Sequence, residues 1–360
     1  MSEYLPMLKG KNIGMVVNQT SVVGSTHLVD TLLSLHFTIT KIYAPEHGFR
    51  GIADAGEEIS ASTDPKTGIP ITSLYGKNFK PTPDQLKGID IMVYDIQDVG
   101  VRFYTFISTL HYVIEACAEN NIPLLILDRP DPNGFYVDGP VLDSAYHSFI
   151  GVDPIPIVYG LTPAEFAKML NGEHWLKNGV QCDLHVVLCS NYTHKTLYQL
   201  PVNPSPNLRT MTAVYLYPSL CLFEGTAVSV GRGTDKPFML IGYPGFKIGN
   251  MKFTPKSIPG AKSPPYLNQI CDGFDLSGLN AGFFEERKHL FMQWLMECYH
   301  AYPHPEGFFT SYFEKLAGNN QLRKQIEKGF SEMEIRRSWE PKLSEYKQIR
   351  KKYLLYEDFE

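Results

Sequence analysis

The sequence predicts an α/β protein with a Rossmann-like parallel sheet domain and a second, smaller mixed α/β domain. Over the first 130 residues, short and continuously apolar runs alternate with helical segments, and acidic residues follow several of these runs. Continuous apolar runs are typical of strands in parallel sheets that helices cover on both faces. Proline-rich turns near residues 130–155 predict a boundary. We therefore assign residues 1–145 to the first domain and residues 146–360 to the second.

The apolar pattern also predicts individual elements. In the first domain we expect strands over residues 13–17, 39–43, 89–94 and 123–127, and helices over 26–36 and 104–119. In the second domain, Thr162 and Glu165 predict a capping box, with Pro163 at the first helical position. Further expected elements are strands over 184–190 and 226–230, a surface loop over 244–265 and charged helices over 311–352.

Charge and composition limit the partners and the compartment. A net charge of -5 argues against nucleic acid or an anionic membrane as a partner. No apolar run approaches the roughly 20 residues of a transmembrane helix. The first residues lack the basic start and apolar core of a signal peptide, so the chain is cytoplasmic or its signal was removed. The six cysteines form no CxxC pair, which favours buried free thiols.

Acidic residues follow three of the predicted strands. Glu46 lies in a glycine-flanked loop after the second strand, Asp95 and Asp98 follow the third, and Asp128 follows the fourth. Ligands of open α/β sheets bind outside the carboxyl ends of the strands, so these side chains are expected on one rim. The alternative for each aspartate is that it only caps a turn or a helix.

Several other chemistries lack support in the sequence. The segment 231–234 (GRGT) lacks both the G-x-G-x-x-G pattern and the Walker lysine spacing. His47, Asp95 and Asp98 offer metal-ligand atoms, but there is no HxH, HExxH or clustered His/Cys spacing. No G-x-S-x-G elbow is present for a nucleophilic serine. We therefore expect no cofactor and no metal.

Carboxylates and nearby polar side chains remain as candidates. Glycosidic cleavage typically needs one carboxylic acid to protonate the leaving oxygen and a second group that assists at the anomeric carbon. Glu46 with Glu224, or Glu46 with a rim aspartate such as Asp128, meets this demand. Ser205 and Asn207 lie between prolines that stiffen the backbone, which suits positioned hydrogen-bonding groups but is equally consistent with a rigid surface turn.

Taken together, these segments closely resemble the bacterial exo-β-N-acetylmuramidase family, whose members release N-acetylmuramic acid from the non-reducing ends of peptidoglycan fragments. The resemblance extends from about residue 8 to residue 356. It is carried by residues 45–51 (PEHGFRG), 95–105 (DIQDVGVRFYT), 128–130 (DRP), 223–226 (FEGT) and 230–234 (VGRGT). Asp131 departs from the asparagine expected in the family's DRPNP-like stretch.

The resemblance implies an active site in the cleft between a Rossmann-like domain and a smaller domain, with Glu46 as a catalytic residue. We expect Glu224 and Asp128 as further catalytic candidates. Expected substrate-binding residues are His47, Arg50, Asp95, Asp98, Arg102, Tyr104, Ser205, Asn207, Thr226 and Arg232.

The implied substrate fits several of these residues. The lactyl carboxylate of N-acetylmuramic acid would suit Arg50, Arg102 or Arg232. Its 2-acetamido group could itself act as the nucleophile. Family members are often exported, so a periplasmic or secreted location is expected, with a cytoplasmic recycling role as the alternative. The competing hypothesis for function is a non-catalytic protein that binds muropeptides or amino sugars in the same cleft.

Overall fold

The computed structural model describes residues 1–49 and 62–360 and is built around a seven-stranded sheet. The strand order is β5-β6-β4-β1-β7-β8-β9, and all neighbours are parallel except β5 and β6. The strands are β1 (Asn12–Val17), β4 (Thr38–Ala44), β5 (Ser62–Thr63), β6 (Pro70–Ser73), β7 (Ile91–Asp95), β8 (Leu124–Leu127) and β9 (Leu184–Val187). This arrangement confirms the predicted Rossmann-like parallel sheet.

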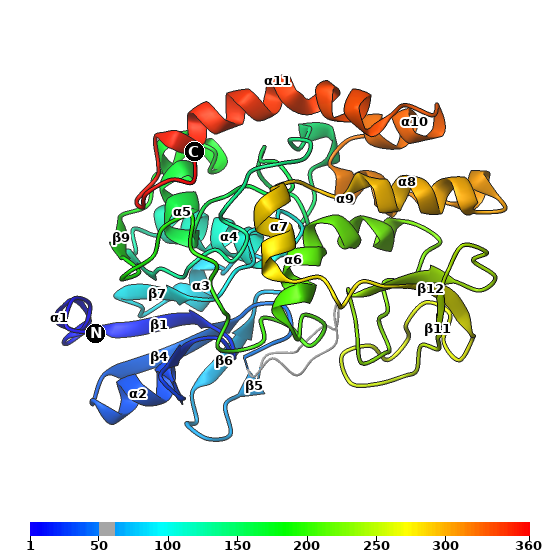
Figure 1. Ribbon diagram of the computed structural model, residues 1–360. Coiled ribbons are helices and arrows are strands. Elements are labelled where there is room, and N and C mark those ends of the chain that lie inside the picture. The colour runs from blue at the N-terminus through cyan, green and yellow to red at the C-terminus, as the bar shows by residue number, and fades with distance from the viewer. Residues whose placement is uncertain (50–61) are drawn as a thin grey trace.

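Strand β1 shows why the apolar runs are continuous. Ile13, Met15 and Val17 pack into the core on the side of α2 (Leu28–Ser34), whereas Val16 packs into the core on the opposite face. That second face is covered by α4 (Phe106–Glu119) and α5 (Pro163–Gly172), above the sheet in Figure 1, where α2 lies below it. Successive side chains point to opposite faces, so a strand buried on both faces needs apolar residues throughout.

The sheet extends beyond the predicted boundary at residue 145. The edge strand β9 pairs with β8, and α5 packs against both strands. The predicted capping box is confirmed, because the Thr162 hydroxyl accepts from the Glu165 backbone and the Glu165 side chain accepts from the Thr162 backbone. Residues far past 145 therefore belong structurally to the first domain.

The second part of the chain is a small antiparallel sheet with surrounding helices. Its sheet has the order β10-β12-β11, with β10 (Leu240–Tyr243), β11 (Met251–Phe253) and β12 (Cys271–Asp275). The helices are α6 (Met211–Leu220), η3 (Cys221–Gly225), α7 (Ala281–Arg287), α8 (Met292–Ala301), α9 (Tyr312–Ala317), α10 (Gln321–Glu327) and α11 (Glu332–Lys351). The smaller mixed α/β part and its charged C-terminal helices are thus confirmed.

Helix α11 joins the two parts. It runs along the top of the molecule in Figure 1, above α4 and α5. The Tyr346 hydroxyl donates to the Tyr159 carbonyl at 2.7 Å, and Arg350 Nε donates to the Gly160 carbonyl at 2.7 Å. Both acceptors lie just before α5, so the C-terminal helix packs directly onto the first domain.

The expected strand over residues 226–230 is wrong, because only isolated bridges form there, from Thr226 to Phe309 and from Ser229 to Gly242. Local side-chain bonds explain the difference. The Thr226 hydroxyl accepts from the Val228 backbone at 3.1 Å, and the Ser229 hydroxyl accepts from the Gly231 backbone at 3.2 Å. Such bonds satisfy backbone donors that a strand would have used.

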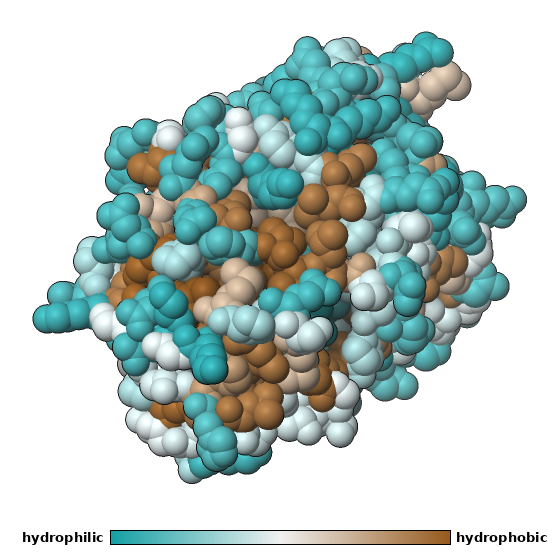
Figure 2. Space-filling model, turned by 90° about the vertical axis from the view of Figure 1, so that its left-hand side faces the viewer, coloured by the Kyte–Doolittle hydropathy of each residue, from teal (hydrophilic) through white to brown (hydrophobic). Residues whose placement is uncertain are grey.

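The remaining short elements lie at the periphery. They are α1 (Leu5–Leu8), β2 (Val22–Val23), β3 (Thr26–His27), α3 (Pro83–Leu86), η1 (Ser144–Tyr146), η2 (Lys177–Gly179) and η4 (Pro305–Gly307). Figure 2 views the side of the molecule that carries α1 and shows hydrophobic residues across the middle of a largely hydrophilic surface. All six cysteines are free, and all except Cys189 are buried. No helix in the described ranges is long and apolar enough to cross a membrane.

Candidate active site

A cavity of about 590 Å³ is lined by residues from both parts of the chain. Glu46 enters it from the carboxyl end of β4, and Thr105 from the start of α4. Glu224 lies in η3, and Tyr312 begins α9. Strand β1 is flanked by β4 and β7, so the chain order reverses there, and the crevice at such a switch point is the usual ligand site of open α/β sheets.

A tight turn presents Glu46. The Gly48 amide donates to the Pro45 carbonyl at 3.0 Å, and His47 has φ of 66°. A positive φ is uncommon outside glycine and often marks functional loops. Phe49 anchors the turn, because it is buried and its ring meets that of His27 edge-on at 4.9 Å.

A threonine hydroxyl group holds the Glu46 carboxylate, and a tyrosine lies close to it. Thr105 Oγ1 donates to Glu46 Oε2 at 2.6 Å. Thr105 is the N-cap residue of α4, yet its side chain does not cap that helix. Tyr75 lies nearby, and burial together with the Glu46 charge raises the pKa of Tyr75.

Glu224 is held differently, in an ion pair with Arg232. Arg232 Nε donates to one Glu224 oxygen and Nη2 to the other, the second bond at 3.2 Å. Although burial opposes the arginine's charge, the Glu224 carboxylate raises the pKa of Arg232. The guanidinium also lies 4.8 Å from the centre of the Phe238 ring. Glu224 therefore faces the cavity as the anionic member of a fixed pair.

The position of Tyr312 shows that Glu46 and Glu224 face the same cavity. Burial raises the pKa of Tyr312, and the charges of Cys221, Glu224 and Glu46 add to the increase. All four side chains line the cavity. One carboxylate held by a threonine hydroxyl and one held by an arginine thus share a single cavity.

Four more of the predicted residues line this cavity. His47 and Tyr104 come from the first domain, and Ser205 and Asn207 from the segment between the prolines. The Tyr104 hydroxyl donates to the Pro204 carbonyl at 2.8 Å. Asn207 Nδ2 donates to the Gly260 carbonyl at 2.8 Å, and Gly260 also lines the cavity.

The rim aspartates do not reach the cavity, which corrects the expectation that they meet the substrate. Asp95 is 1% exposed and is bonded by Arg129, with Nε at 2.7 Å and Nη2 at 3.0 Å. Asp98 accepts from the Tyr159 hydroxyl and from the Gly100 amide, and burial raises the pKa of Asp98 to about 7.

Asp128 also points into the protein and does not line the cavity, so it is not placed for catalysis. It accepts from the Ala164 amide at 2.9 Å and from the Tyr356 hydroxyl at 2.6 Å. Ala164 lies in the first turn of α5, whose N-cap residue is Thr162, so Asp128 satisfies a further free amide of that turn and has the structural role of the alternative interpretation. Burial raises the pKa of Asp128 to about 6.

Arg102 and Thr226 also lie outside the cavity lining. The Arg102 guanidinium is buried and donates to the carbonyls of Pro140, Ile155 and Leu316, and burial lowers its pKa to about 9. The Thr226 hydroxyl donates to the Phe223 carbonyl at 2.8 Å. Both side chains hold loops together. Arg50 lies outside the described residues.

Sequence reasoning missed several cavity residues. Thr105 had a usable signal, since it ends the segment 95–105 that carries the family resemblance and directly precedes a helix. Tyr312 had none, because it lies in a charged helical stretch far from the other motifs. The loop 244–265 was expected only to cover the surface, yet it contributes cavity residues. The missed lining residues include Tyr75, Thr105, Tyr217, Lys262, Ser263 and Tyr312.

The geometry indicates a carboxylate-based glycoside hydrolase. No group of three or more His, Cys, Asp or Glu side chains within the described ranges is arranged to hold a metal ion. Two glutamates in one cavity, with different hydrogen-bond partners, offer a proton donor and an anion for acid–base cleavage of a glycosidic bond.

Comparison with known proteins shows the family. Residues 13–212 match the domain described as "Exo-beta-N-acetylmuramidase NamZ, N-terminal", and residues 215–356 match its C-terminal counterpart. The chain belongs to the exo-β-N-acetylmuramidase NamZ family.

Individual relatives agree with this assignment. The chain is 40% identical to the peptidoglycan β-N-acetylmuramidase NamZ of Bacillus subtilis (strain 168), over 99% of this chain and 89% of that protein. Two crystal structures of DUF1343 family proteins from Bacteroides fragilis NCTC 9343 are similar in fold. Their TM-scores are 0.92 and 0.86 at 48% and 28% sequence identity, and each comparison covers 99% of this chain and 97% of the other.

Proposed function

We propose that this chain is an exo-acting glycoside hydrolase that releases non-reducing terminal N-acetylmuramic acid from peptidoglycan fragments. Membership of the NamZ family supports the reaction and the substrate class. The observation that carries the residue assignment is the shared cavity of Glu46 and Glu224, each with its own partners.

Glu46 is the general acid of this proposal. It lies on the loop after β4, and Thr105 fixes its carboxyl group by a hydrogen bond. A carboxylic acid at this position donates its proton to the glycosidic oxygen as the bond to the leaving sugar breaks. It needs fixed geometry because proton transfer requires hydrogen-bond distance to that oxygen.

Glu224 is the anionic partner. Positive charge develops at the anomeric carbon as the bond breaks, and a fixed carboxylate across the cavity stabilises it. Glu224 acts either by attacking that carbon or by orienting the substrate's 2-acetamido group for attack. Of the predicted arginines that the structure describes, Arg232 is the one that lines the cavity, so we place the lactyl carboxylate near Arg232.

The test of Glu46 uses the Glu46→Gln variant, which keeps shape but cannot supply the proton. The substrates are an N-acetylmuramyl–N-acetylglucosamine disaccharide and a dinitrophenyl β-glycoside of N-acetylmuramic acid. We expect a roughly 100-fold or larger loss on the disaccharide. The loss on the dinitrophenyl glycoside should be much smaller, because that leaving group needs no proton. Glu306→Gln, at an exposed glutamate, is the matched control.

Two results would count against this proposal. Equal release by wild type and Glu46→Gln would remove Glu46 from the mechanism. Binding of the disaccharide by wild type without any release would favour a non-catalytic muropeptide-binding protein.

The Glu224→Ala variant distinguishes the two possible roles of Glu224, attack on the anomeric carbon and orientation of the 2-acetamido group. With the dinitrophenyl glycoside, added azide should restore turnover and give a glycosyl azide if Glu224 attacks the anomeric carbon. If the acetamido group attacks, azide should leave the rate of this variant unchanged. In both cases the variant without azide must be slower than wild type, and an equal rate refutes a role for Glu224.

The compartment stays a prediction. Because peptidoglycan lies outside the cytoplasmic membrane, we propose that the protein acts in the periplasm or outside the cell. Fractionation of the source cells with an antibody to this chain would test this, and recovery in the cytoplasm would instead favour the recycling role.

A further inference from the structure

Four aromatic side chains form a cluster beside Glu46 that the proposed reaction does not use. Phe79 and Phe149 are stacked, with ring centres 3.9 Å apart and planes at 19°. Tyr112 is nearly parallel to both, with centres 6.4 Å and 6.3 Å away. Tyr75 meets Phe79 and Phe149 edge-on at 6.1 Å and 5.7 Å. We call Tyr75, Phe79, Tyr112 and Phe149 the aromatic cluster.

The aromatic cluster is not part of the protein's interior. Each of its four rings is only partly buried. Among the described residues, none of the four belongs to the three hydrophobic cores or packs against them. They come from three separate segments, namely the loop after β6, helix α4 and the loop before residue 150. A contiguous apolar patch that the core does not require is typical of a binding surface.

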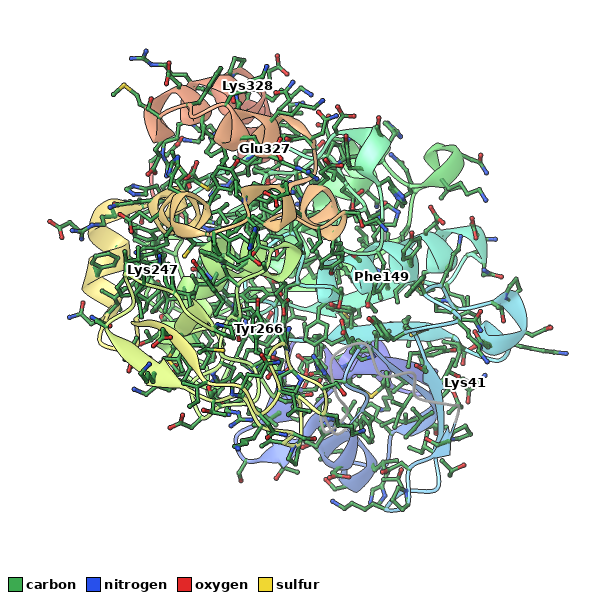
Figure 3. The ribbon with its side chains drawn as sticks, turned by 90° about the vertical axis from the view of Figure 1, so that its right-hand side faces the viewer. Lys41, Phe149, Lys247, Tyr266, Glu327 and Lys328 are labelled. Atoms are coloured by element: carbon green, nitrogen blue, oxygen red, sulfur yellow. The ribbon has the colours of Figure 1, made fainter. Side chains whose placement is uncertain are left out.

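Its position relative to Glu46 indicates what could bind there. Tyr75 and Ile150 line the active-site cavity, and Phe149 precedes Ile150 in the chain. Tyr75 belongs to the cluster and lies close enough to Glu46 for the Glu46 charge to raise the pKa of Tyr75. Figure 3 labels both Phe149 and Tyr266, which lie apart in that view. The Tyr266 hydroxyl donates to the Ala227 carbonyl, in the loop between Glu224 and Arg232, so Tyr266 marks the Glu224 side. The cluster thus lies on the Glu46 side of the cavity.

A general acid must lie beside the oxygen that joins the terminal sugar to the leaving group. The leaving group therefore occupies the Glu46 side of the cavity, where the aromatic cluster is found. We propose that this cluster is the subsite for the leaving sugar, an N-acetylhexosamine whose pyranose ring packs against the aromatic side chains. This inference rests on the proposed function.

The chemistry of the two surfaces is complementary. A pyranose ring has a face of C–H bonds, which carry slight positive charge and little hydration. Aromatic rings have a negative face and bury large apolar areas. The cluster would therefore bind the leaving sugar in the ground state and in the transition state, and its loss should mainly raise KM.

The test compares kcat/KM for two substrates that differ only in the leaving group. One is the N-acetylmuramyl–N-acetylglucosamine disaccharide, and the other is the methyl β-glycoside of N-acetylmuramic acid, which has no sugar to stack. Phe149→Ala should lower the ratio of the two kcat/KM values about tenfold, mainly through KM for the disaccharide. Phe330→Ala is the matched control, because that phenylalanine is 38% exposed and outside the cluster.

A ratio equal to that of wild type would overturn the inference, because a purely structural defect lowers both values together. Phe149→Leu keeps an apolar side chain in place if Phe149→Ala does not fold, and it should show the same selective loss. A thermal melt of each variant identifies unfolding.

A direct binding measurement keeps this inference distinct from the proposed function. Isothermal titration of N,N′-diacetylchitobiose into wild type and Phe149→Ala does not depend on turnover. Binding that the variant weakens supports the subsite even if no muramic glycoside is cleaved. Equal binding by both proteins, or no binding to wild type at millimolar sugar, overturns it.

Discussion

The hydrogen bond from Thr105 to Glu46 gives the most direct test of how the site is built. Thr105→Val removes the hydroxyl group and keeps the size and branching of the side chain. The bond that is lost is short, 2.6 Å, and its acceptor is the carboxylate of the proposed general acid. Because Thr105 does not use this hydroxyl to cap α4, the variant should affect Glu46 more than the helix.

The expected size of the effect follows from the kind of bond. A hydrogen bond to a charged group contributes about 1.5–3 kcal/mol, and bonds of this length are typical of charge-assisted pairs. Glu46 is only partly buried, so we take the lower end, about 1.5 kcal/mol. That energy corresponds to a loss of about tenfold in kcat/KM.

The assay is hydrolysis of the disaccharide by wild type, Thr105→Val and Thr105→Ser, with thermal melts of all three. Serine restores the hydroxyl group and should recover most of the rate, which a role in packing alone would not explain. The loss in Thr105→Val should shrink with the dinitrophenyl glycoside, whose departure needs no acid. Wild-type rates in Thr105→Val, or a serine variant as slow as the valine variant, would refute the reasoning.

Three other predictions test placements in the structure. Asp128→Asn should keep kcat within about threefold of wild type, since Asp128 bonds the first turn of α5 outside the cavity, and should lower the melting temperature instead. Although burial opposes its charge, hydrogen bonds to Asp153 and a second carboxylate raise the pKa of His111 to about 9. Because this folded-state value exceeds the unfolded one, the stabilisation is complete below about pH 6.5 and is lost as the pH rises through about 9. His111→Gln should therefore lower the free energy of unfolding, measured with urea, by about 3 kcal/mol at pH 6 and by much less at pH 10. A loss of stability that does not change with pH would contradict this prediction. Asp358→Asn weakens the bidentate pair with the buried Arg350 and should cost about 2 kcal/mol of unfolding free energy, whereas wild-type stability would contradict that pair's importance.

The parallel sheet could be predicted because burial on both faces leaves a local signal. The strands that contain Ile13 and Val93 are buried at nearly all successive positions, the strand that contains Ile42 is buried over its last three residues, and each was found within a few residues of its predicted place. The extent of the domain could not be predicted in this way. Strand β9 pairs with β8 across a long stretch of intervening chain, and its own apolar run does not specify its neighbour.

The candidate site was predictable only in part for a related reason. A strand exit places an acidic residue on the rim, but its partner decides where the side chain points. Asp95 pairs with Arg129, and Asp128 bonds the start of α5 and Tyr356. Glu46 instead accepts from Thr105 and lines the cavity. These pairings join distant segments, so no local pattern distinguishes a catalytic carboxylate from a structural one.

The C-terminal helices, to which the sequence assigned no role, support the proposed anionic partner of Glu46. Gly225, next to Glu224, lies so close to α9 that a Cβ atom there would be 2.4 Å from the Phe313 Cα. The Thr310 amide donates to the Gly225 carbonyl at 2.9 Å, and Tyr312 at the start of α9 lines the cavity. The first domain thus supplies the proposed acid, while α9 fixes both the backbone that carries Glu224 and a tyrosine near the two carboxylates. Because the site needs both parts, the packing of α9 and α11 onto the sheet domain is a requirement of the proposed chemistry as well as of the fold.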